Sequence, residues 1–256
     1  MNLPSVSQRI SSSDQRSLQG GFQKSFIKTQ KFTLTSYHRI TRLGQPLSIY
    51  IEGDGLSWVS RTQLSTDPTP LEPLVLELAI LDRADNVAYI ARPGQYSSTG
   101  KPDCSSSYWS NKRFSKEVIE SMNEAISQLA SQAGTKIIQL IGYSGGAAVA
   151  VLIAARRHDI ASLKTIAGNL DPQAVNRYHN VSPLDGSLNP MDVAEKIMNI
   201  PQCHFVGSKD TMIPLWIVQS FVRKEGNQDD RSIRIIKGCS HIKGWQQHWD
   251  ELQNKS

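Results

Sequence analysis

The sequence contains few cysteines and no long apolar run, and both shortages exclude whole classes of protein. The three cysteines lie far apart, at positions 104, 203 and 239, which is neither a disulfide framework nor a zinc-ligand pattern. No apolar stretch reaches the roughly 18–20 residues that a membrane-spanning helix needs, and residues 1–30 lack the apolar core of a secretory signal. As written, the sequence therefore predicts a cytoplasmic protein. An exported or membrane-associated location stays open for a protein whose signal has been removed.

Basic residues are concentrated at the amino-terminal end of the chain. The whole sequence has 28 basic and 23 acidic residues, a formal charge of +5. Residues 1–42 carry seven of these basic residues and a single acid, Asp14, so the rest of the chain is close to neutral. The charges are spread out and form no dense block, which favours a solvated, flexible segment over residues 1–30. Peripheral contact of this segment with an anionic membrane stays open, whereas the near-neutral body predicts no nucleic-acid partner.

Strand-like and helix-like patterns alternate along the rest of the chain, which predicts an α/β fold with a mostly parallel central sheet flanked by helices. The expected strands are residues 32–40, 46–52, 87–91, 136–141, 161–167, 203–207 and 233–237. The expected helices are residues 115–133, 147–157, 213–224 and 243–252. Turn signals interrupt the alternation in residues 171–200, which we interpret as a small cap inserted above the sheet edge. Because no repeat or linker divides them, residues 31–256 are expected to form one domain.

The strongest chemical signal is the segment Gly142-Tyr143-Ser144-Gly145-Gly146. It lies between an apolar strand pattern and an Ala/Val-rich helix pattern, the context in which a G-x-S-x-G motif forms a nucleophile elbow. A sharp strand-to-helix turn strains the backbone of the serine and needs small neighbours, which the glycines supply. The motif matches neither a dinucleotide-binding loop nor a phosphate-binding P-loop. We therefore expect Ser144 to act as a nucleophile.

A serine nucleophile needs a base, and the base needs an acid that orients it. Asp210 and His241 each follow a predicted strand, so both fall at the carboxyl edge of the sheet, where α/β folds build their sites. The chain order serine, aspartate, histidine is the order expected for this motif. We therefore expect Asp210 to be the acid and His241 the base. Asp171, which follows the preceding strand, is an alternative acid, and His248 in the last helix is an alternative base.

A third requirement is a pair of backbone N–H groups that stabilise the negative charge of a tetrahedral intermediate. One should belong to Gly145, directly after the nucleophile. The other should come from the turn after residues 46–52, from Asp54 or its neighbour Gly55. The alternative is an ordinary Asp-Gly turn that takes no part in catalysis.

Together the elbow, the acid loop at residues 207–214 and the late histidine resemble the α/β-hydrolase superfamily, from about residue 32 to the end of the chain. Four segments are similar to a group of poorly characterised bacterial α/β-hydrolases: YIEGDG at 50–55, ARPGQY at 91–96, AGNLD at 167–171 and SLNP at 187–190. Many of those proteins resemble secreted lipoproteins with a lipid-attachment signal. This sequence differs, because it has no such signal and has Gly94 where a cysteine is expected in the relatives. A disulfide from that position to Cys104 is therefore excluded.

The resemblance implies hydrolysis of a carboxylic ester, of the esterase or lipase type, through an acyl-enzyme intermediate. Ser144 would attack, His241 would take its proton, and Asp210 would hold the imidazolium. This route needs no metal and no organic cofactor. The same three residues also serve peptidases and acyltransferases, which remain alternatives. A further alternative is a non-catalytic interaction protein that keeps the fold.

The substrate is expected to be a small ester or another acyl compound, bound by segments 95–114 and 171–200 at the edge that carries Ser144. We expect Tyr96, Trp109, Leu188 and Tyr143 to line an acyl pocket. The alternative is that the aromatic residues only pack the cap onto the body. Arg92 either binds a substrate carboxylate or pairs with a nearby acid. Neither the acyl length nor the oligomeric state follows from the sequence.

Overall fold

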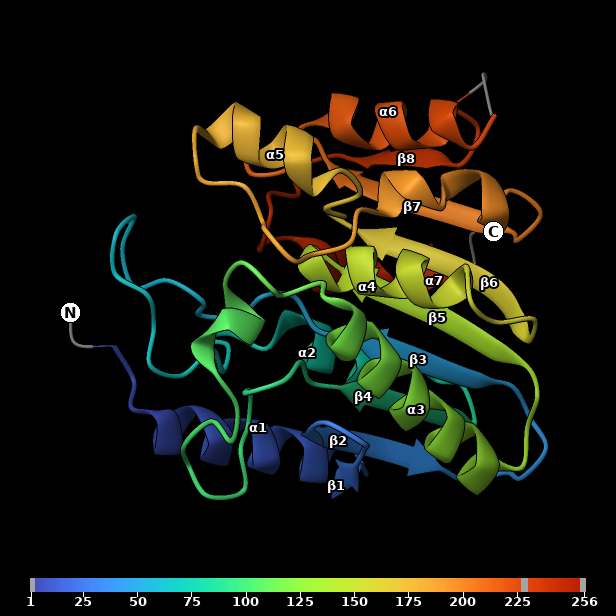
Figure 1. Cartoon of the computed structure of the whole chain (residues 1–256). Helices are drawn as coiled ribbons and strands as arrows, with labels where there is room; N and C mark the ends of the chain where they lie inside the picture. Colours follow the sequence, from blue (N-terminus) through green and yellow to red (C-terminus); the bar gives the residue numbers. More distant parts are fainter. Residues whose placement is uncertain (1–2, 227–229, 254–256) are drawn as a thin grey trace.

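The central feature of the computed structural model, which describes residues 3–226 and 230–253, is a single sheet. Its eight described strands follow the order β1-β2-β4-β3-β5-β6-β7-β8 (Figure 1). Their bounds are β1 Gln23–Lys28, β2 Thr33–Ile40, β3 Leu47–Ile51, β4 Asn86–Ile90, β5 Ile138–Tyr143, β6 Ile160–Ile166, β7 Gln202–Gly207 and β8 Ile233–Ile236. The six strands from β4 to β8 in this order are parallel, whereas β2 pairs antiparallel with both β1 and β4.

Helices cover both faces of the sheet because its central strands are apolar on both sides. Every residue of β3 and β4 is buried, as expected for strands in the middle of a parallel sheet. Side chains alternate between the faces, so Ile49 belongs to one core and Tyr50 to the other. The helices α3 Lys116–Ala133, α4 Gly145–Ala154 and α6 Leu215–Lys224 pack on the first face, and α2 Leu74–Leu81 and α7 Trp245–Gln253 on the second.

This architecture confirms the predicted α/β-hydrolase fold. The predicted strands and helices all occur, with ends that move by a few residues. Gly134, for example, ends α3 in a left-handed conformation with φ 63°, which a glycine adopts without steric cost. The segment between β6 and β7, predicted as a cap, contains α5 Pro172–His179 and two short 3₁₀ helices, Pro190–Asp192 and Ala194–Ile197.

The amino-terminal segment differs from the prediction of a flexible tail over residues 1–30. Its described part contains the helix α1 Val6–Gln19 and the edge strand β1, which pairs with β2 at six positions. Ser5 caps α1 through a capping box with Gln8. The buried residues of α1 are Arg9, Ser13 and Ser17, all polar. Hydrophobic periodicity therefore gives no helix signal, although the helix packs against α2 and β1.

Most of the basic side chains in this region pair with the body of the protein. Arg9 is buried against Asp67 at 3.7 Å, whereas Lys24 pairs at 2.8 Å with Asp14 of the same region. Arg16 and Arg42 pair with the carboxylates of Glu77 and Asp85 on the body. Arg39 donates to the carbonyls of Asp82 and Ala84 on the body and to that of Gly20 within the region. Most of the basic side chains of residues 1–42 therefore have a partner within the folded protein. No helix in the described parts of the chain is long and apolar enough to cross a membrane.

The carboxyl ends of β3, β5, β6, β7 and β8 meet at one edge of the sheet (Figure 1). The turn after β3, the elbow after β5, the cap after β6 and the loops after β7 and β8 therefore gather there. Parallel strands place all these connections on one side, which is where α/β folds bind their ligands.

Candidate active site

Ser144 lies on a strained turn between β5 and α4. Its backbone has φ 51° and ψ −119°, a region that residues other than glycine rarely adopt. The turn is possible because its neighbours lack side chains. A Cβ on Gly142 would lie 2.5 Å from the Gly146 carbonyl oxygen, and a Cβ on Gly146 would lie 2.3 Å from the Ile51 carbonyl oxygen. The predicted elbow therefore has the geometry that its motif requires, and Ser144 is partly exposed at its tip.

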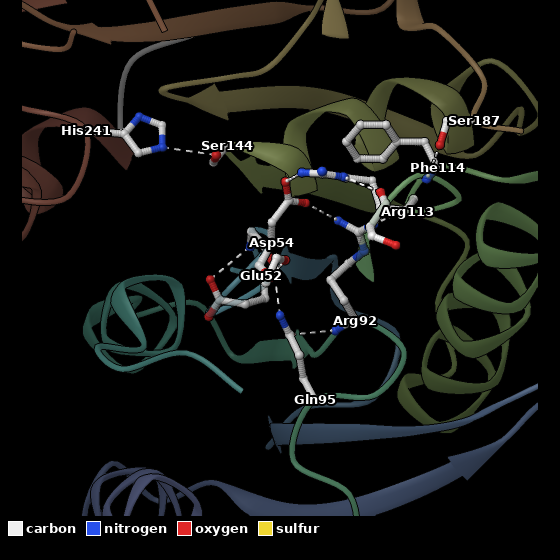
Figure 2. Close-up of polar contacts among 12 residues, drawn as sticks. Glu52, Asp54, Arg92, Gln95, Arg113, Phe114, Ser144, Ser187 and His241 are labelled. Atoms are coloured by element: carbon white, nitrogen blue, oxygen red, sulfur yellow. Dashed lines mark hydrogen bonds and ion pairs between the residues drawn. The ribbon is translucent and has the colours of Figure 1, made fainter. Parts of the chain in front are cut away.

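A hydrogen-bonded chain joins Ser144 to His241 and Asp210. Nε2 of His241 lies 3.0 Å from Ser144 Oγ (Figure 2). Nδ1 of the same ring lies 2.9 Å from Asp210 Oδ2. The other carboxylate oxygen of Asp210 accepts the N–H groups of Met212 and Ile213 at 2.8 and 2.9 Å. The Asp210 side chain is fully buried, and that of His241 is 16% exposed. Since a carboxylate accepts from Nδ1–H, Nε2 is left without a proton and can accept the serine hydroxyl.

The alternative acid, Asp171, and the alternative base, His248, take no part in this hydrogen-bonded chain. Asp171 caps α5, where its Oδ1 accepts the Ala174 N–H at 3.1 Å and the Asn189 amide at 3.4 Å. His248 lies on α7 between two buried tryptophans, and within the described residues it has no hydrogen bond to Ser144 or Asp210. The three residues that the sequence puts forward are thus the ones that the fold brings together.

The turn after β3 lies against the start of α4. Gly145 is the first residue of α4, and a Cβ on it would lie 2.1 Å from Asp54 Oδ1. Among the described residues, the N–H groups of Asp54 and Gly145 donate to no acceptor. Gly55 has φ 62°, and a Cβ there would lie 2.0 Å from the Pro68 carbonyl oxygen, so this glycine shapes the turn. Two free donors, one of them at a helix amino end, are therefore available beside Ser144.

The side chain of Glu52 anchors the turn after β3, a role that the sequence did not predict. Its carboxylate accepts the Gly53 N–H and the Tyr89 hydroxyl, each at 2.9 Å. The residue is only 2% exposed. Burial raises the pKa of Glu52 to about 7, although both hydrogen bonds favour the ionised form. The predicted strand ends at this residue, and only the fold shows that its side chain turns back into the sheet.

Replacing Glu52 by glutamine is expected to reduce the pH dependence of stability. The folded chain keeps the Glu52 proton up to about pH 7, whereas the unfolded chain releases it near 4.5. The wild type should therefore lose up to about 3 kcal/mol of unfolding free energy as the pH rises through that window. Urea denaturation at about pH 5 and about pH 8 measures this loss. Glu52→Gln should show a smaller loss, keeping only the part that comes from other groups such as Glu225, whose pKa burial also raises to about 7, and Glu120→Gln, at an exposed position, should retain the full loss. Equal losses in all three proteins would refute the assignment.

Two of the four residues expected to contact substrate are packed into the body of the protein. Tyr96 is fully buried in the core on the α2 side, and its ring packs edge-on against Tyr37 and Tyr89. Trp109 is 6% exposed, and its indole N–H donates to the Ser65 carbonyl at 3.1 Å. Both therefore follow the alternative interpretation, in which aromatic residues pack the loops onto the body. The sequence does not reveal which way a loop side chain faces.

The other two residues lie closer to the elbow and the cap. The Tyr143 ring is tilted against His241, with 5.3 Å between the ring centroids, and it also covers Gly53. Leu188 lines a cavity of about 380 Å³ in the cap. The other apolar residues of its wall are Pro172, Val181, Pro183 and Leu184. The strand-end loop that leads into this cap contacts the elbow, since the Asn169 N–H donates to the Ser144 carbonyl at 3.0 Å.

Arg92 pairs with an acid and is not open to a substrate carboxylate. Its guanidinium lies 3.5 Å from Asp54, and its side chain is 4% exposed. Arg113, which the sequence analysis did not single out, binds the same carboxylate at 2.6 Å. Within the described residues, no group of three or more His, Cys, Asp or Glu side chains is arranged to hold a metal ion.

The fold and the strained serine define the class: the protein is an α/β hydrolase with a serine at its nucleophile elbow. Residues 77–233, more than half of the chain, match the serine hydrolase (FSH1) family, and the chain belongs to that family. A comparison with functionally curated proteins finds no significant match.

Solved structures of several hydrolases share the fold. The esterase Pf2001 of Pyrococcus furiosus is 14% identical, with a TM-score of 0.63 over 91% of this chain and 88% of that chain. The α/β hydrolase GrgF of Penicillium sp. sh18 is 13% identical, with a TM-score of 0.65 over 91% and 95%. Est1E of Butyrivibrio proteoclasticus is 15% identical, with a TM-score of 0.60 over 90% and 95%. At these identities the likeness establishes the fold and leaves the substrate to the site itself.

Proposed function

We propose that this serine hydrolase cleaves carboxylic esters through an acyl-enzyme intermediate, with Ser144 as nucleophile, His241 as base and Asp210 as the orienting acid. The observation that carries the proposal is the chain of hydrogen bonds of 2.9 and 3.0 Å from Asp210 through His241 to Ser144. The base lies within hydrogen-bonding reach of both the nucleophile and the acid, as serine catalysis requires.

In the acylation step, Ser144 Oγ attacks the ester carbonyl carbon and its proton moves to His241 Nε2. The carbonyl oxygen becomes an oxyanion that accepts the N–H groups of Asp54 and Gly145. When the tetrahedral intermediate collapses, the ester C–O bond breaks and His241 gives its proton to the departing alkoxide. Water then attacks the acyl-serine by the same route and releases the carboxylic acid. Asp210 holds the imidazole ring and balances its positive charge in both halves.

The two backbone donors carry much of the expected rate acceleration. Each oxyanion-hole hydrogen bond contributes about 3–4 kcal/mol when it is made only in the transition state. Gly145 adds the positive end of α4, ten residues long, to one of these donors. Neither donor is engaged by another described group, so neither must be released before substrate binds.

The acyl group is proposed to lie between Tyr143 and the cap. The cavity of about 380 Å³ at Leu188 has the size of a small-ligand site and a partly apolar wall. Its first wall residue, Pro172, lies only three positions after Asn169, which contacts the elbow. We therefore propose a small ester as the substrate, with its acyl length to be measured.

A fluorophosphonate probe is expected to label the wild type and not Ser144→Ala, because the probe reacts only with an activated serine. The matched control is Ser127→Ala, which removes an exposed serine of α3 and should label like the wild type. A series of p-nitrophenyl esters, with the matching anilides beside it, then measures the acyl length and separates esterase from peptidase activity. A folded wild type that neither labels nor turns over any ester would contradict the proposal and favour a non-catalytic interaction protein.

A further inference from the structure

Two arginines bind one carboxylate directly beside the candidate oxyanion hole (Figure 2). Arg113 Nη1 lies 2.6 Å from Asp54 Oδ2, and Arg92 Nη1 lies 3.5 Å from Asp54 Oδ1. The same carboxylate touches the start of α4, since a Cβ on Gly145 would lie 2.1 Å from it. The side chain of Asp54 is thus held between two cations and the residue that supplies the second oxyanion donor.

The remaining polar groups of this turn are also anchored. The Gly53 N–H donates to Glu52 at 2.9 Å, and the Gly53 carbonyl accepts the Gln95 amide at 3.1 Å. The Asp54 carbonyl accepts the Ser57 hydroxyl at 2.6 Å. The Asp54 N–H is the exception, because it donates to no described acceptor. The orientation of this N–H is therefore set by the anchors around it, among which the carboxylate of Asp54 itself is held by two arginines.

The charge of the Asp54 carboxylate would harm catalysis if it were not neutralised. Burial by itself raises the pKa of Asp54, but Arg113 and Arg92 outweigh burial and hold this pKa below its usual value. Asp54 is therefore ionised at neutral pH, next to the place where the oxyanion forms. Burial lowers the pKa of Arg92 to about 10, which still leaves this group protonated. Without the arginines, a bare carboxylate would repel the developing negative charge at short range in a partly dry site.

Arg113 also links the oxyanion turn to the cap. Its carbonyl accepts a hydrogen bond from the Arg92 guanidinium, and its own Nε donates to the Ser110 carbonyl at 2.7 Å. The next residue, Phe114, donates its N–H to Ser187 Oγ at 3.1 Å, and Ser187 Oγ donates to the Asn111 carbonyl at 2.7 Å. The segment that presents Arg113 is thus fixed by the cap (Figure 2).

We propose that Arg113 is a positioning residue for the oxyanion hole: it holds and neutralises the Asp54 carboxylate so that the Asp54 N–H stays available to the tetrahedral intermediate. This inference rests on the proposed ester hydrolysis. Arg113 does not touch the reacting atoms and acts through Asp54. Its loss therefore reduces transition-state stabilisation and leaves ground-state binding of the ester nearly unchanged.

Replacing Arg113 by methionine tests this role in the full chain with p-nitrophenyl esters. We expect kcat to fall by about 10- to 100-fold and KM to change by less than about twofold, because a displaced oxyanion donor acts on the transition state. Arg113→Lys, which keeps the charge, should recover most of the lost rate. The matched control is Arg83→Met, which removes another arginine–aspartate pair, of 3.1 Å, at an exposed site. This control should keep wild-type kcat.

A second substitution separates a positioning role from general damage to the fold. In Arg113→Met the Asp54 carboxylate keeps only the more distant Arg92, at 3.5 Å, as a counter-charge, so adding Asp54→Asn should raise kcat above that of the single Arg113 variant. A boronic acid that mimics the tetrahedral intermediate should lose affinity in Arg113→Met in parallel with kcat/KM. Unfolding curves and fluorophosphonate labelling show whether each variant is folded and keeps an active serine.

The proposal is overturned if Arg113→Met keeps wild-type kcat, or if it loses rate only through KM. It is also overturned if Asp54→Asn lowers the rate of the Arg113→Met protein further. If Arg113→Met does not fold, Arg113→Lys carries the test, and an unchanged affinity of the boronic acid with a lowered kcat would refute the role. A wild type without any ester turnover would refute the proposed function itself, which distinguishes the two failures.

Discussion

Replacing His241 by alanine is expected to lower kcat for ester hydrolysis by about a million-fold, close to the effect of removing Ser144 itself. The reason is that the members of such a triad act as one unit. Without Nε2 at 3.0 Å, the Ser144 hydroxyl has no acceptor for its proton and attacks only as a neutral alcohol. The departing alkoxide also loses its proton donor. Initial-rate kinetics with a reactive p-nitrophenyl ester measure the loss.

The fold should survive this substitution, because Asp210 keeps the N–H groups of Met212 and Ile213 as partners. His248→Ala is the matched control, since it removes the other histidine of the carboxyl-terminal region. His248 lies on α7, away from the hydrogen-bonded chain, so kcat in this variant should stay within about twofold of wild type. The assignment is wrong if His248→Ala loses the activity and His241→Ala keeps it.

Replacing Gly146 by alanine is expected to destabilise the protein by about 2–4 kcal/mol and to impair the elbow at the same time. A Cβ there would lie 2.3 Å from the Ile51 carbonyl oxygen and 2.5 Å from the Glu52 carbonyl oxygen. Both contacts are with backbone, which cannot rotate away as a side chain would. Helix α4 would have to move off β3 and carry Gly145 away from Asp54. The midpoint of urea denaturation and the fluorophosphonate labelling rate measure both effects.

A loss of stability in Gly146→Ala would be informative, because the intrinsic helix propensity of alanine predicts a gain. Alanine is better than glycine inside a helix by about 1 kcal/mol. Gly44→Ala provides the comparison, since nothing lies within 4 Å of its Cβ, and it should cost only about 1–2 kcal/mol for its φ of 81°. A Gly146→Ala protein that is as stable and as active as the wild type would show that close approach of α4 to β3 is not required.

Fold and chemistry rest on different parts of this chain. The hydrolases with similar structures share the sheet and the helices at identities of 13–15%. The chemical argument instead rests on five residues at the carboxyl edge of the sheet: Asp54, Ser144, Gly145, Asp210 and His241. The same edge hosts many reactions in α/β folds, because its loops vary independently of the sheet that supports them. The substrate must therefore be found by experiments on the site and on the cap.

The sequence alone was sufficient for the features that depend on neighbouring residues. The elbow was readable because its glycines, its serine, the apolar strand before it and the small-residue helix after it are consecutive. Asp210 and His241 were readable because each follows a strand, and parallel strands bring their carboxyl ends to one edge. Composition misled in α1, where Arg9, Ser13 and Ser17 are buried polar residues. It was silent in α2, where Leu74–Leu81 is apolar except for Glu77 and shows no helical period.

Tertiary structure decided how loop side chains are used. Tyr96 and Trp109 have the composition of a substrate pocket, yet both are packed inside, because the direction of a loop side chain depends on what the rest of the chain places beside it. Asp54 lies 38 residues before Arg92 and 59 before Arg113, and no periodic pattern connects these positions. Only the folded sheet brings the three charges together beside Ser144. An ion pair between distant segments has no local signal, whereas a turn, a cap or a strand end is determined by the few residues that form it.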